Sequence, residues 1–272
     1  MNQLTAMSFG AGVQSTAMML LLKHQPGMLA EAVGEAPSIA LFSDTGAESH
    51  LVYAHLEQML ADGLPIPLET VSNGNLETSE GTRSFIPYYT RGKDGEIGMV
   101  RRKCTAEFKV LPLERRLREL AGLKPGQKGT PGLISIWMGI STDEVIRMRQ
   151  HPSPTMRNVY PLIEIGWDRG RCLEYARAHG FEPPKSRCFM CPYTRDWARV
   201  KREEPWTWRR AVAYDRAIRD STARGIQDPA YLHRLAVPLD EAVELMALRE
   251  ATNGTPLFGA DFAEECSGYC GL

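Results

Sequence analysis

A short apolar segment that runs into a glycine-rich turn and then into a helix limits the fold of this chain more than any other feature. Residues 4–9 predict a buried strand, residues 10–12 read Gly-Ala-Gly, and residues 15–23 predict the helix. Glycines at such a turn let backbone N–H groups approach an anion, and the helix adds the positive end of its dipole. Residues 8–16 are therefore a candidate phosphate-binding loop.

The same alternation of strand and helix continues along the chain. Residues 38–43, Ser-Ile-Ala-Leu-Phe-Ser, predict a second strand, residues 51–61 a helix, and residues 66–71 a third strand. Such an alternation is typical of an α/β fold with a doubly wound, mainly parallel sheet. Further along, residues 133–140 predict another buried strand, and Gly180 is in the position that ends a helix over residues 168–179.

The rest of the chain is organised differently. Residues 72–103 read as a long excursion of the kind that forms lids and binding loops. After Pro183 and Pro184, residues 197–224 predict helix with a break at Pro205, and residues 239–251 predict a last helix. We therefore expect a nucleotide-binding α/β domain over residues 1–182 and a helical, cysteine-containing region over residues 183–272.

Charge and hydropathy bear on the partners of the chain. The net charge is −1, so the chain as a whole has no basic footprint for nucleic acid. Its apolar runs are shorter than a membrane span requires, and its N-terminus has no signal-peptide pattern. We expect a cytoplasmic protein without a membrane partner.

The glycine-rich loop differs from the two best-known nucleotide-binding motifs. It lacks the Gly-Lys-Ser/Thr ending of a Walker A loop, and Ser15 breaks the G-x-G-x-x-G pattern of a dinucleotide-binding fold. Ser8, Ser15 and Thr16 add hydroxyl donors for an anion. A glycine turn with only a structural role is the alternative.

Four motifs, in chain order, carry a resemblance to a known family. They are Ser-Phe-Gly-Ala-Gly-Val-Gln-Ser-Thr at residues 8–16, Asp44-Thr45-Gly46, Arg102-Lys103-Cys104-Thr105 with Lys109, and Gly-Ile-Ser-Thr-Asp-Glu at residues 139–144 with Arg147. Together they resemble the PP-loop superfamily, in particular the phosphoadenylyl-sulfate (PAPS) reductase-like proteins with an adenine nucleotide alpha hydrolase-like fold.

The resemblance implies that the loop binds the pyrophosphate of ATP, with Mg²⁺, or the phosphosulfate of a sulfonucleotide. Asp44 would lie near the nucleotide as a catalytic candidate, and Arg102, Lys109 and Arg147 would neutralise phosphate charge. From the residues alone, a solvated basic stretch is the alternative for Arg102 and Lys109. The implied nucleotide-binding residues are Ser8, Gly10, Gly12, Gln14, Ser15, Thr16, Asp44, Thr45, Gly46, Arg102, Lys109, Gly139 and Arg147.

One position departs from the family pattern. Gln14 stands where the family has an aspartate, so a carboxylate suited to Mg²⁺ is missing. An amide can still donate a hydrogen bond to a phosphate oxygen. A second ambiguous residue is Asp143, which can equally serve as a helix cap.

Six cysteines form a second constellation. Cys188 and Cys191 make a C-x-x-C, Cys266 and Cys270 a C-x₃-C near the end of the sequence, and Cys104 lies in the basic motif. In a reducing compartment such a set favours metal ligation or thiol chemistry over disulfides. Cys172, on a predicted helix, is expected to be a buried structural residue.

The segment Lys-Ser-Arg-Cys-Phe-Met-Cys-Pro at residues 185–192 resembles that of PAPS-reductase-like proteins, including sulfur transferases with a [4Fe–4S] cluster. The expected ligands are Cys104, Cys188, Cys191 and Cys266, with Cys270 as an alternative fourth. A four-thiolate zinc site is compatible with the same spacing. The tail Tyr-Cys270-Gly-Leu resembles that of sulfonucleotide reductases, which makes Cys270 a candidate nucleophile, although their following histidine is absent.

Residues 195–210 interleave arginines with Trp197, Trp206 and Trp208, a pattern that can stack bases and hold a phosphate backbone. Because Glu203 and Glu204 interrupt the charge, we favour a helix that buries its tryptophans and exposes its arginines.

Three functions follow. The first is ATP-dependent sulfur transfer, in which an acceptor nucleobase or nucleic acid is adenylylated and a sulfide, free or from a sulfur-donor protein, displaces AMP. The second is reduction of phosphoadenylyl or adenylyl sulfate. The third is a zinc-stabilised nucleotide-binding module without turnover.

Overall fold

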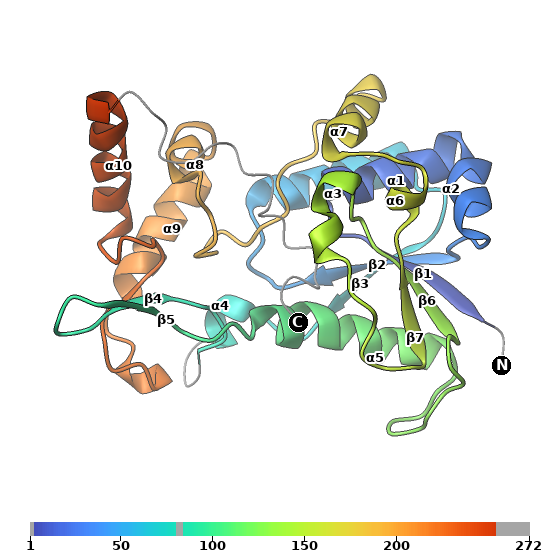
Figure 1. Cartoon of the computed structure of the whole chain (residues 1–272), viewed down its shortest axis with the longest axis horizontal. Coiled ribbons are helices and arrows are strands. Elements are labelled where there is room, and N and C mark those ends of the chain that lie inside the picture. The colour runs from blue at the N-terminus through green and yellow to red at the C-terminus, as the bar shows by residue number, and fades with distance from the viewer. Residues whose placement is uncertain (1–2, 80–83, 254–272) are drawn as a thin grey trace.

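The computed structural model describes residues 3–79 and 84–253, and a five-stranded parallel sheet forms its centre (Figure 1). The strand order is β3-β2-β1-β6-β7. The bounds are Leu4–Ser8 for β1, Ile39–Asp44 for β2, Leu68–Ser72 for β3, Ile134–Trp137 for β6 and Met156–Val159 for β7. In the central register, Met7 pairs with Ala40 on one side and Trp137 on the other. The predicted α/β fold class is confirmed.

The central strands are apolar because both of their faces are covered. All four residues of β6 are buried, as are the first four of β2. A parallel sheet flanked by helices on both faces needs such continuous apolar runs, whereas a half-exposed strand would alternate with polar residues. This explains why residues 38–43 and 133–140 stand out in the sequence.

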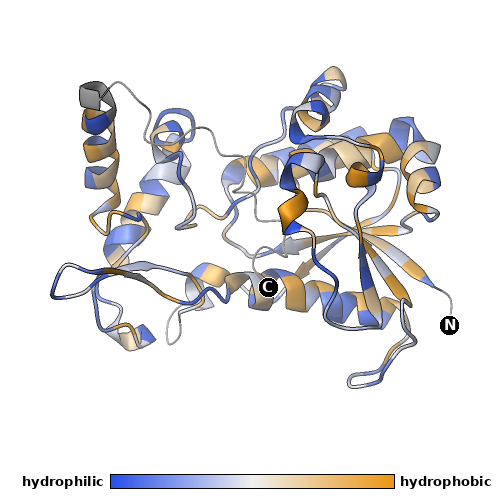
Figure 2. Ribbon diagram, in the orientation of Figure 1, coloured by the Kyte–Doolittle hydropathy of each residue, from blue (hydrophilic) through white to orange (hydrophobic). Residues whose placement is uncertain are grey.

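Helices cover the two faces of the sheet. Two buried clusters divide between these faces, one built around α1 and one around α5. The first face carries α1 Val13–His24, α2 Pro26–Val33, α3 His50–Asp62, α6 Pro161–Glu164 and α7 Arg169–Ala178. The opposite face carries α5 Leu111–Leu120, on which hydrophobic and hydrophilic residues alternate around the helix (Figure 2). Among the described residues, no helix combines the length and the apolar character that a membrane span requires.

Helix ends follow the chemistry of their sequence. Ser49 precedes α3 and its hydroxyl accepts the backbone N–H of Leu51, while Asp168 caps α7 by accepting from Arg171 N. Gly180, with a φ of +83°, follows the last residues of α7. A glycine reaches this left-handed conformation without the steric cost that a Cβ brings, so the predicted helix stop is confirmed.

A second layer lies beside the parallel sheet. An antiparallel sheet of order β5-β4-β8 is flanked by helices and has its own buried cluster. Its strands are β4 Tyr89–Arg91, β5 Ile97–Met99 and β8 Ala230–Tyr231. The other elements of this part are α4 Leu76–Ser79, α8 Trp197–Glu203, α9 Pro205–Ala217, η3 Thr222–Arg224 and α10 Leu239–Asn253.

The buried cluster of this second layer contains residues from both sides of the domain boundary expected between residues 182 and 183. Ile86 and Tyr88 come from the excursion over residues 72–103 and Phe108 from the segment that follows it, and all three pack in the same cluster as Phe189 and Trp197. The β4–β5 hairpin also pairs with β8, through Thr90 and Ala230. The excursion is therefore part of the second layer in space.

The basic aromatic segment folds as α8 and the start of α9, with the break at Pro205. Trp197 is buried and its ring packs edge-on against that of Trp208, while Trp206 is about half exposed. Arg199 pairs with Asp196 and Glu203, and Arg210 pairs with Glu77. The tryptophans serve mainly for packing and these arginines have acidic partners, which agrees with the favoured interpretation.

Asp215 connects several segments of the second layer, so we expect that replacing it destabilises the protein. It is buried, its side chain accepts the backbone N–H groups of Leu232 and Leu239, and it pairs with Arg219 at 2.5 Å. Asp215→Ala should lower the free energy of unfolding by about 3–5 kcal/mol, because it leaves buried donors without an acceptor. Urea denaturation measures the loss.

The matched control removes Asp240, which pairs with Arg216 on the surface. Asp240→Ala should cost less than about 1 kcal/mol, since exposed ion pairs contribute little. Equal losses in the two variants would contradict the organising role of Asp215.

Candidate functional site

The strand order changes direction next to β1, and this is where open parallel sheets form a ligand crevice. The glycine-rich loop follows β1, and the segment with Gly139 follows β6, its neighbour. The two loops touch: a Cβ on Gly139 would lie 3.2 Å from Ser15 N and 3.3 Å from Gln14 Cβ. Gly139 therefore allows a close approach that a larger residue would disturb.

The glycine-rich loop turns sharply from Ser8, the last residue of β1, into α1. Ala11 has a positive φ of 51°, a conformation that is unfavourable for a residue with a Cβ. Gly12 is the N-cap of α1: its N–H donates to Ser15 Oγ, and that hydroxyl donates to Gly12 O, both at 3.2 Å. The N-terminus of α1, with its positive dipole end, thus lies at the crevice.

Gln14 is held by three neighbours. It is buried, its amide nitrogen donates to Ser141 Oγ at 3.2 Å and Glu144 Oε2 at 3.1 Å, and its amide oxygen accepts from Arg169 at 3.2 Å. These contacts engage both ends of the amide, so Gln14 joins the loop to the segment after β6. Arg147 belongs to the same network, 2.5 Å from Glu144.

Asp143 and Arg169 meet at the start of α7. Asp143 Oδ1 accepts the backbone N–H of Arg169 at 3.0 Å, so this carboxylate caps a helix, although one later in the chain. Arg169 in turn reaches Gln14. Sequence analysis did not select Arg169, since it lies outside the four motifs.

Asp44 closes the turn after β2. Its Oδ1 accepts the backbone N–H of Gly46 at 2.8 Å and the hydroxyl of Tyr53 at 2.7 Å. Burial, together with the hydrogen bond to Asp44, raises the pKa of Tyr53 well above its usual range, so the phenol stays a donor. Gly46 has a φ of +68°, and a Cβ there would collide with Asn75. These contacts fix the direction in which the chain leaves the sheet edge.

A short backbone bridge brings the C-x-x-C segment to this edge. Glu48 and Cys188 form an antiparallel bridge, with Ser49 N donating to Arg187 O and Phe189 N to Ala47 O, both at 2.9 Å. One residue earlier, Ser186 Oγ would lie 3.6 Å from a Cβ on Gly10. The segment therefore passes directly beside the glycine-rich loop.

Arg187 fastens the same segment from the other side. This buried guanidinium donates to Asp196 at 2.9 Å and to Glu204 at 2.6 Å, and Glu204 also accepts from Ser49 Oγ. Burial opposes ionisation of Asp196, but Arg187, Lys185 and Arg199 outweigh it and hold the pKa of Asp196 well below its usual range. The cysteine segment is thus tied by paired charges to the residues that precede α8 and α9, and Glu204 links it further to Ser49 at the start of α3.

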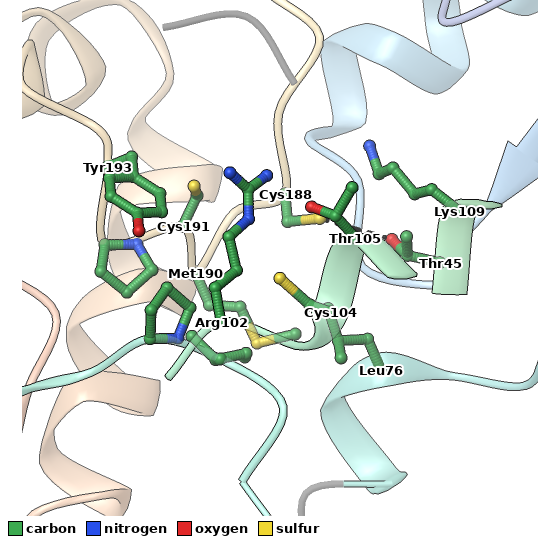
Figure 3. A pocket seen from close by; sticks show the side chains of 13 residues that line it. Thr45, Leu76, Arg102, Cys104, Thr105, Lys109, Cys188, Met190, Cys191 and Tyr193 are labelled. Carbon is green, nitrogen blue, oxygen red and sulfur yellow. Dashed lines mark hydrogen bonds between the residues drawn. The ribbon is translucent and has the colours of Figure 1, made fainter. Parts of the chain in front are cut away.

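Three of the predicted ligands line one cavity at this edge. Cys104, Cys188 and Cys191 surround it together with Arg102, Lys109 and other side chains (Figure 3). Cys104 arrives from the excursion, where its N–H bonds to Phe85 O. In the ranges 3–79 and 84–253, no group of three or more His, Cys, Asp or Glu residues is arranged to hold a metal ion. Cys266 and Cys270 lie outside the described residues.

Cys188 has a polar but buried environment. Its thiol donates to Glu48 Oε1 at 3.6 Å and lies 3.5 Å from Thr45 Oγ1. Burial and then the Glu48 carboxylate raise the pKa of Cys188 well above its usual range, against the opposing effect of Lys109. The second oxygen of Glu48 is buried and has no hydrogen-bond partner in the described structure. Glu48 is a site residue that lies just beyond the Asp-Thr-Gly motif, and the sequence analysis assigned no role to it.

A π-helical turn, η1 Ala106–Val110, aims Lys109 at this site. Its ammonium lies 3.1 Å from Glu48 Oε1. Ser43 Oγ donates to Lys109 O and Asn73 Nδ2 to Glu107 O, which anchors the turn to the ends of β2 and β3. Such turns widen a helix locally and recur at functional sites. Lys109 is buried, so the alternative of a solvated basic side chain does not apply to it.

Comparisons with known proteins add little. The sequence matches no family model and no curated protein. A solved structure of phosphoadenylyl-sulfate (PAPS) reductase from Candida auris, in complex with phosphate, is similar over 67% of this chain and 74% of that chain, with a TM-score of 0.40 and 13% identity. A likeness this weak carries no argument about function, so the site must be interpreted from its own residues.

The pH dependence of stability follows from two buried histidines. Burial lowers the pKa of His55, which bonds Thr16 at 2.8 Å, and of His233 to about 4. Their stabilising effect is complete above about pH 6.5, the unfolded pKa, and falls away towards pH 4, because only the unfolded chain takes up protons in that window. The free energy of unfolding should drop by on the order of 1–2 kcal/mol per histidine at pH 5.

Urea denaturation at several pH values tests this expectation. The double variant His55→Gln/His233→Gln should show a flatter profile between pH 6.5 and pH 4. A profile unchanged from that of the parent protein would contradict the assignment.

The buried Glu48–Lys109 pair predicts strong coupling. Lys109→Met should lower the free energy of unfolding by about 3–5 kcal/mol, because it leaves a buried carboxylate without its cation. Adding Glu48→Gln should recover most of that loss. Thermal and urea denaturation of the single and double variants measure the coupling.

Lys23→Met is the matched control, since Lys23 pairs with Asp62 at the surface. It should cost less than about 1 kcal/mol. If Lys109→Met and its double variant are equally unstable, the two side chains are not coupled.

Proposed function

We propose that this protein is a nucleotide-dependent enzyme that transfers sulfur to an acceptor activated by ATP. The observation that carries the proposal is the cavity in which Cys104, Cys188 and Cys191 meet Lys109. The C-x-x-C segment that lines it also passes beside the glycine-rich loop, where Ser186 lies next to Gly10. Thiols from distant parts of the sequence, brought to the crevice edge of a parallel sheet, suit sulfur chemistry on a bound nucleotide.

In the proposed reaction, a carbonyl oxygen of the acceptor attacks the α-phosphorus of ATP. An O–P bond forms, the bond to the β-phosphate oxygen breaks, and pyrophosphate leaves with Mg²⁺. Inorganic sulfide then attacks the activated carbon, a C–S bond forms, the C–O bond breaks, and AMP leaves. The sequence of steps is redox neutral, because sulfide enters and remains at the same oxidation level.

The loop residues have defined tasks in this scheme. The backbone N–H group of Gly10 and the N-terminus of α1 would stabilise the charge of the departing pyrophosphate, since preorganised donors act strongly on developing charge. Gln14, held by Glu144 and Arg169, would keep the loop in register with the segment after β6. Arg147 would supply positive charge at the crevice.

Cys104, Cys188 and Cys191 would hold a [4Fe–4S] cluster, with a residue outside the described ranges as a further ligand. Soft thiol donors fit such a cluster in kind, and all three line one cavity. When bound, the cluster would supply an iron that retains sulfide. Lys109 and Arg102 would balance the negative charge of the thiolates.

Two other functions compete with this one. Reduction of a sulfonucleotide rests on the tail sequence around Cys270, and it predicts release of sulfite from PAPS. A binding module without turnover predicts one tightly bound zinc and no nucleotide product. Products and metal content therefore separate the three functions.

The test is to purify the whole chain without oxygen and to measure iron, acid-labile sulfide, zinc and the products formed from ATP. About four iron and four sulfide per chain, as in a [4Fe–4S] centre, with AMP and pyrophosphate formed when sulfide and acceptor are present, are the expected results. Cys104→Ser, Cys188→Ser and Cys191→Ser should each lose iron and at least about a hundredfold in rate, because each removes a ligand.

Cys172→Ala is the matched control, since Cys172 is buried in α7 away from the cavity. It should keep its iron. Sulfite release from PAPS with intact ATP would replace sulfur transfer by the reductase function, and one zinc without iron would replace it by the binding module.

A further inference from the structure

A second cavity adjoins the one with the cysteines. Tyr193 and Pro192 line both cavities, and the second one has a volume of about 170 Å³. Its wall is built from the β4–β5 hairpin, from the turn after the C-x-x-C, and from residues 233 and 234 together with Met246 of α10. The aromatic, hydroxyl and basic side chains in this wall are Tyr89, Tyr193, Thr194, Arg195, His233 and Arg234.

The wall combines rings with positive charge. Tyr89, Tyr193 and Arg234 are each half-buried, whereas Arg195 is exposed. Tyr89, Tyr193, Arg195 and Arg234 line the same cavity, and burial raises the pKa of Tyr89 against the opposing effect of the two arginines. Aromatic faces stack on bases, and guanidinium groups bind phosphate oxygens.

Thr194 offers a polar group to the second cavity. The residue is only 7% exposed, it lines this cavity, and its hydroxyl is buried with no hydrogen-bond partner among the residues that the structure describes. A buried hydroxyl without a partner is costly, and such a group in a cavity wall is commonly explained by a ligand or water that satisfies it. Burial lowers the pKa of His233 to about 4, so this ring adds no positive charge to the wall near neutral pH.

We propose that the second cavity binds a nucleobase that carries a phosphate, with the base between Tyr89 and Tyr193, a polar edge on Thr194 and the phosphate on Arg195 and Arg234. This inference rests on the proposed sulfur transfer, because it identifies the cavity as the site of the acceptor beside the cysteines. The ligand is a free nucleotide or one nucleotide of a single strand, and the test has an arm for each.

Binding to the whole chain is measured with a labelled single-stranded DNA of ten nucleotides and with the corresponding RNA. It is measured separately with the four nucleoside monophosphates. An ATP analogue that cannot be cleaved is present at saturation in every arm, so the ATP site is filled. We expect a strand or a monophosphate to bind under these conditions, and the arm that gives the higher affinity identifies the source.

Two variants probe the cavity. Arg234→Gln should weaken binding about tenfold and lower its salt dependence, because it removes one phosphate contact. Thr194→Val should weaken binding severalfold and leave the melting temperature of the free protein equal or higher, because the hydroxyl has no partner to lose. Arg177→Gln, whose side chain pairs with Glu182 on the far surface, is the control and should bind as the parent does.

The outcomes separate this inference from the proposed function. If no strand or monophosphate binds in the presence of the ATP analogue, or if both variants bind like the control, the inference is wrong even where iron and AMP formation are intact. If the two variants lose binding but the purified protein contains zinc or no metal, the nucleotide site in the second cavity is supported and the proposed sulfur transfer is wrong.

Discussion

The site depends on a backbone bridge of three residues on each side. Ala47, Glu48 and Ser49 follow the turn after β2, and they pair with residues 187–189 of the C-x-x-C segment. This pairing spans about half of the chain in sequence, yet it sets the position of Cys188 against Glu48 and of Ser186 against Gly10. Without it, the thiols would have no defined relation to the crevice of the parallel sheet.

Buried charges make that bridge specific. Arg187 has two carboxylate partners, and Glu48 receives Lys109 and the hydroxyl of Thr45. Desolvating such groups is costly unless each one finds its partner, so alternative registers of the segment would leave charges unpaired. The same contacts that add little net stability therefore select one arrangement of the cysteines.

The sequence was sufficient for four of the five strands of the parallel sheet, because apolar runs between turns indicate buried strands. It missed β7, whose four residues Met156–Val159 include Arg157 and Asn158 and are only partly buried. It also identified Cys104, Cys188 and Cys191 as a group. It could not give the pairing of β4 with β8 or the role of Glu48, since both depend on partners far away in the chain. Gln14 shows the same limit: its type suggested a phosphate donor, but its partners Ser141, Glu144 and Arg169 are set by tertiary packing.

The insertion of the β4–β5 hairpin beside β8 has a consequence for how the protein is made. Thr90 leaves the ribosome long before Ala230, its partner in the sheet. Contacts between such distant segments form late, because the entropy of closing a long loop must be overcome first. During synthesis the edge of β4 that later pairs with β8 would remain unpaired while the parallel sheet is already able to form. An unpaired strand edge can pair with other chains. The cysteine cavity, whose walls come from both layers, would be completed last.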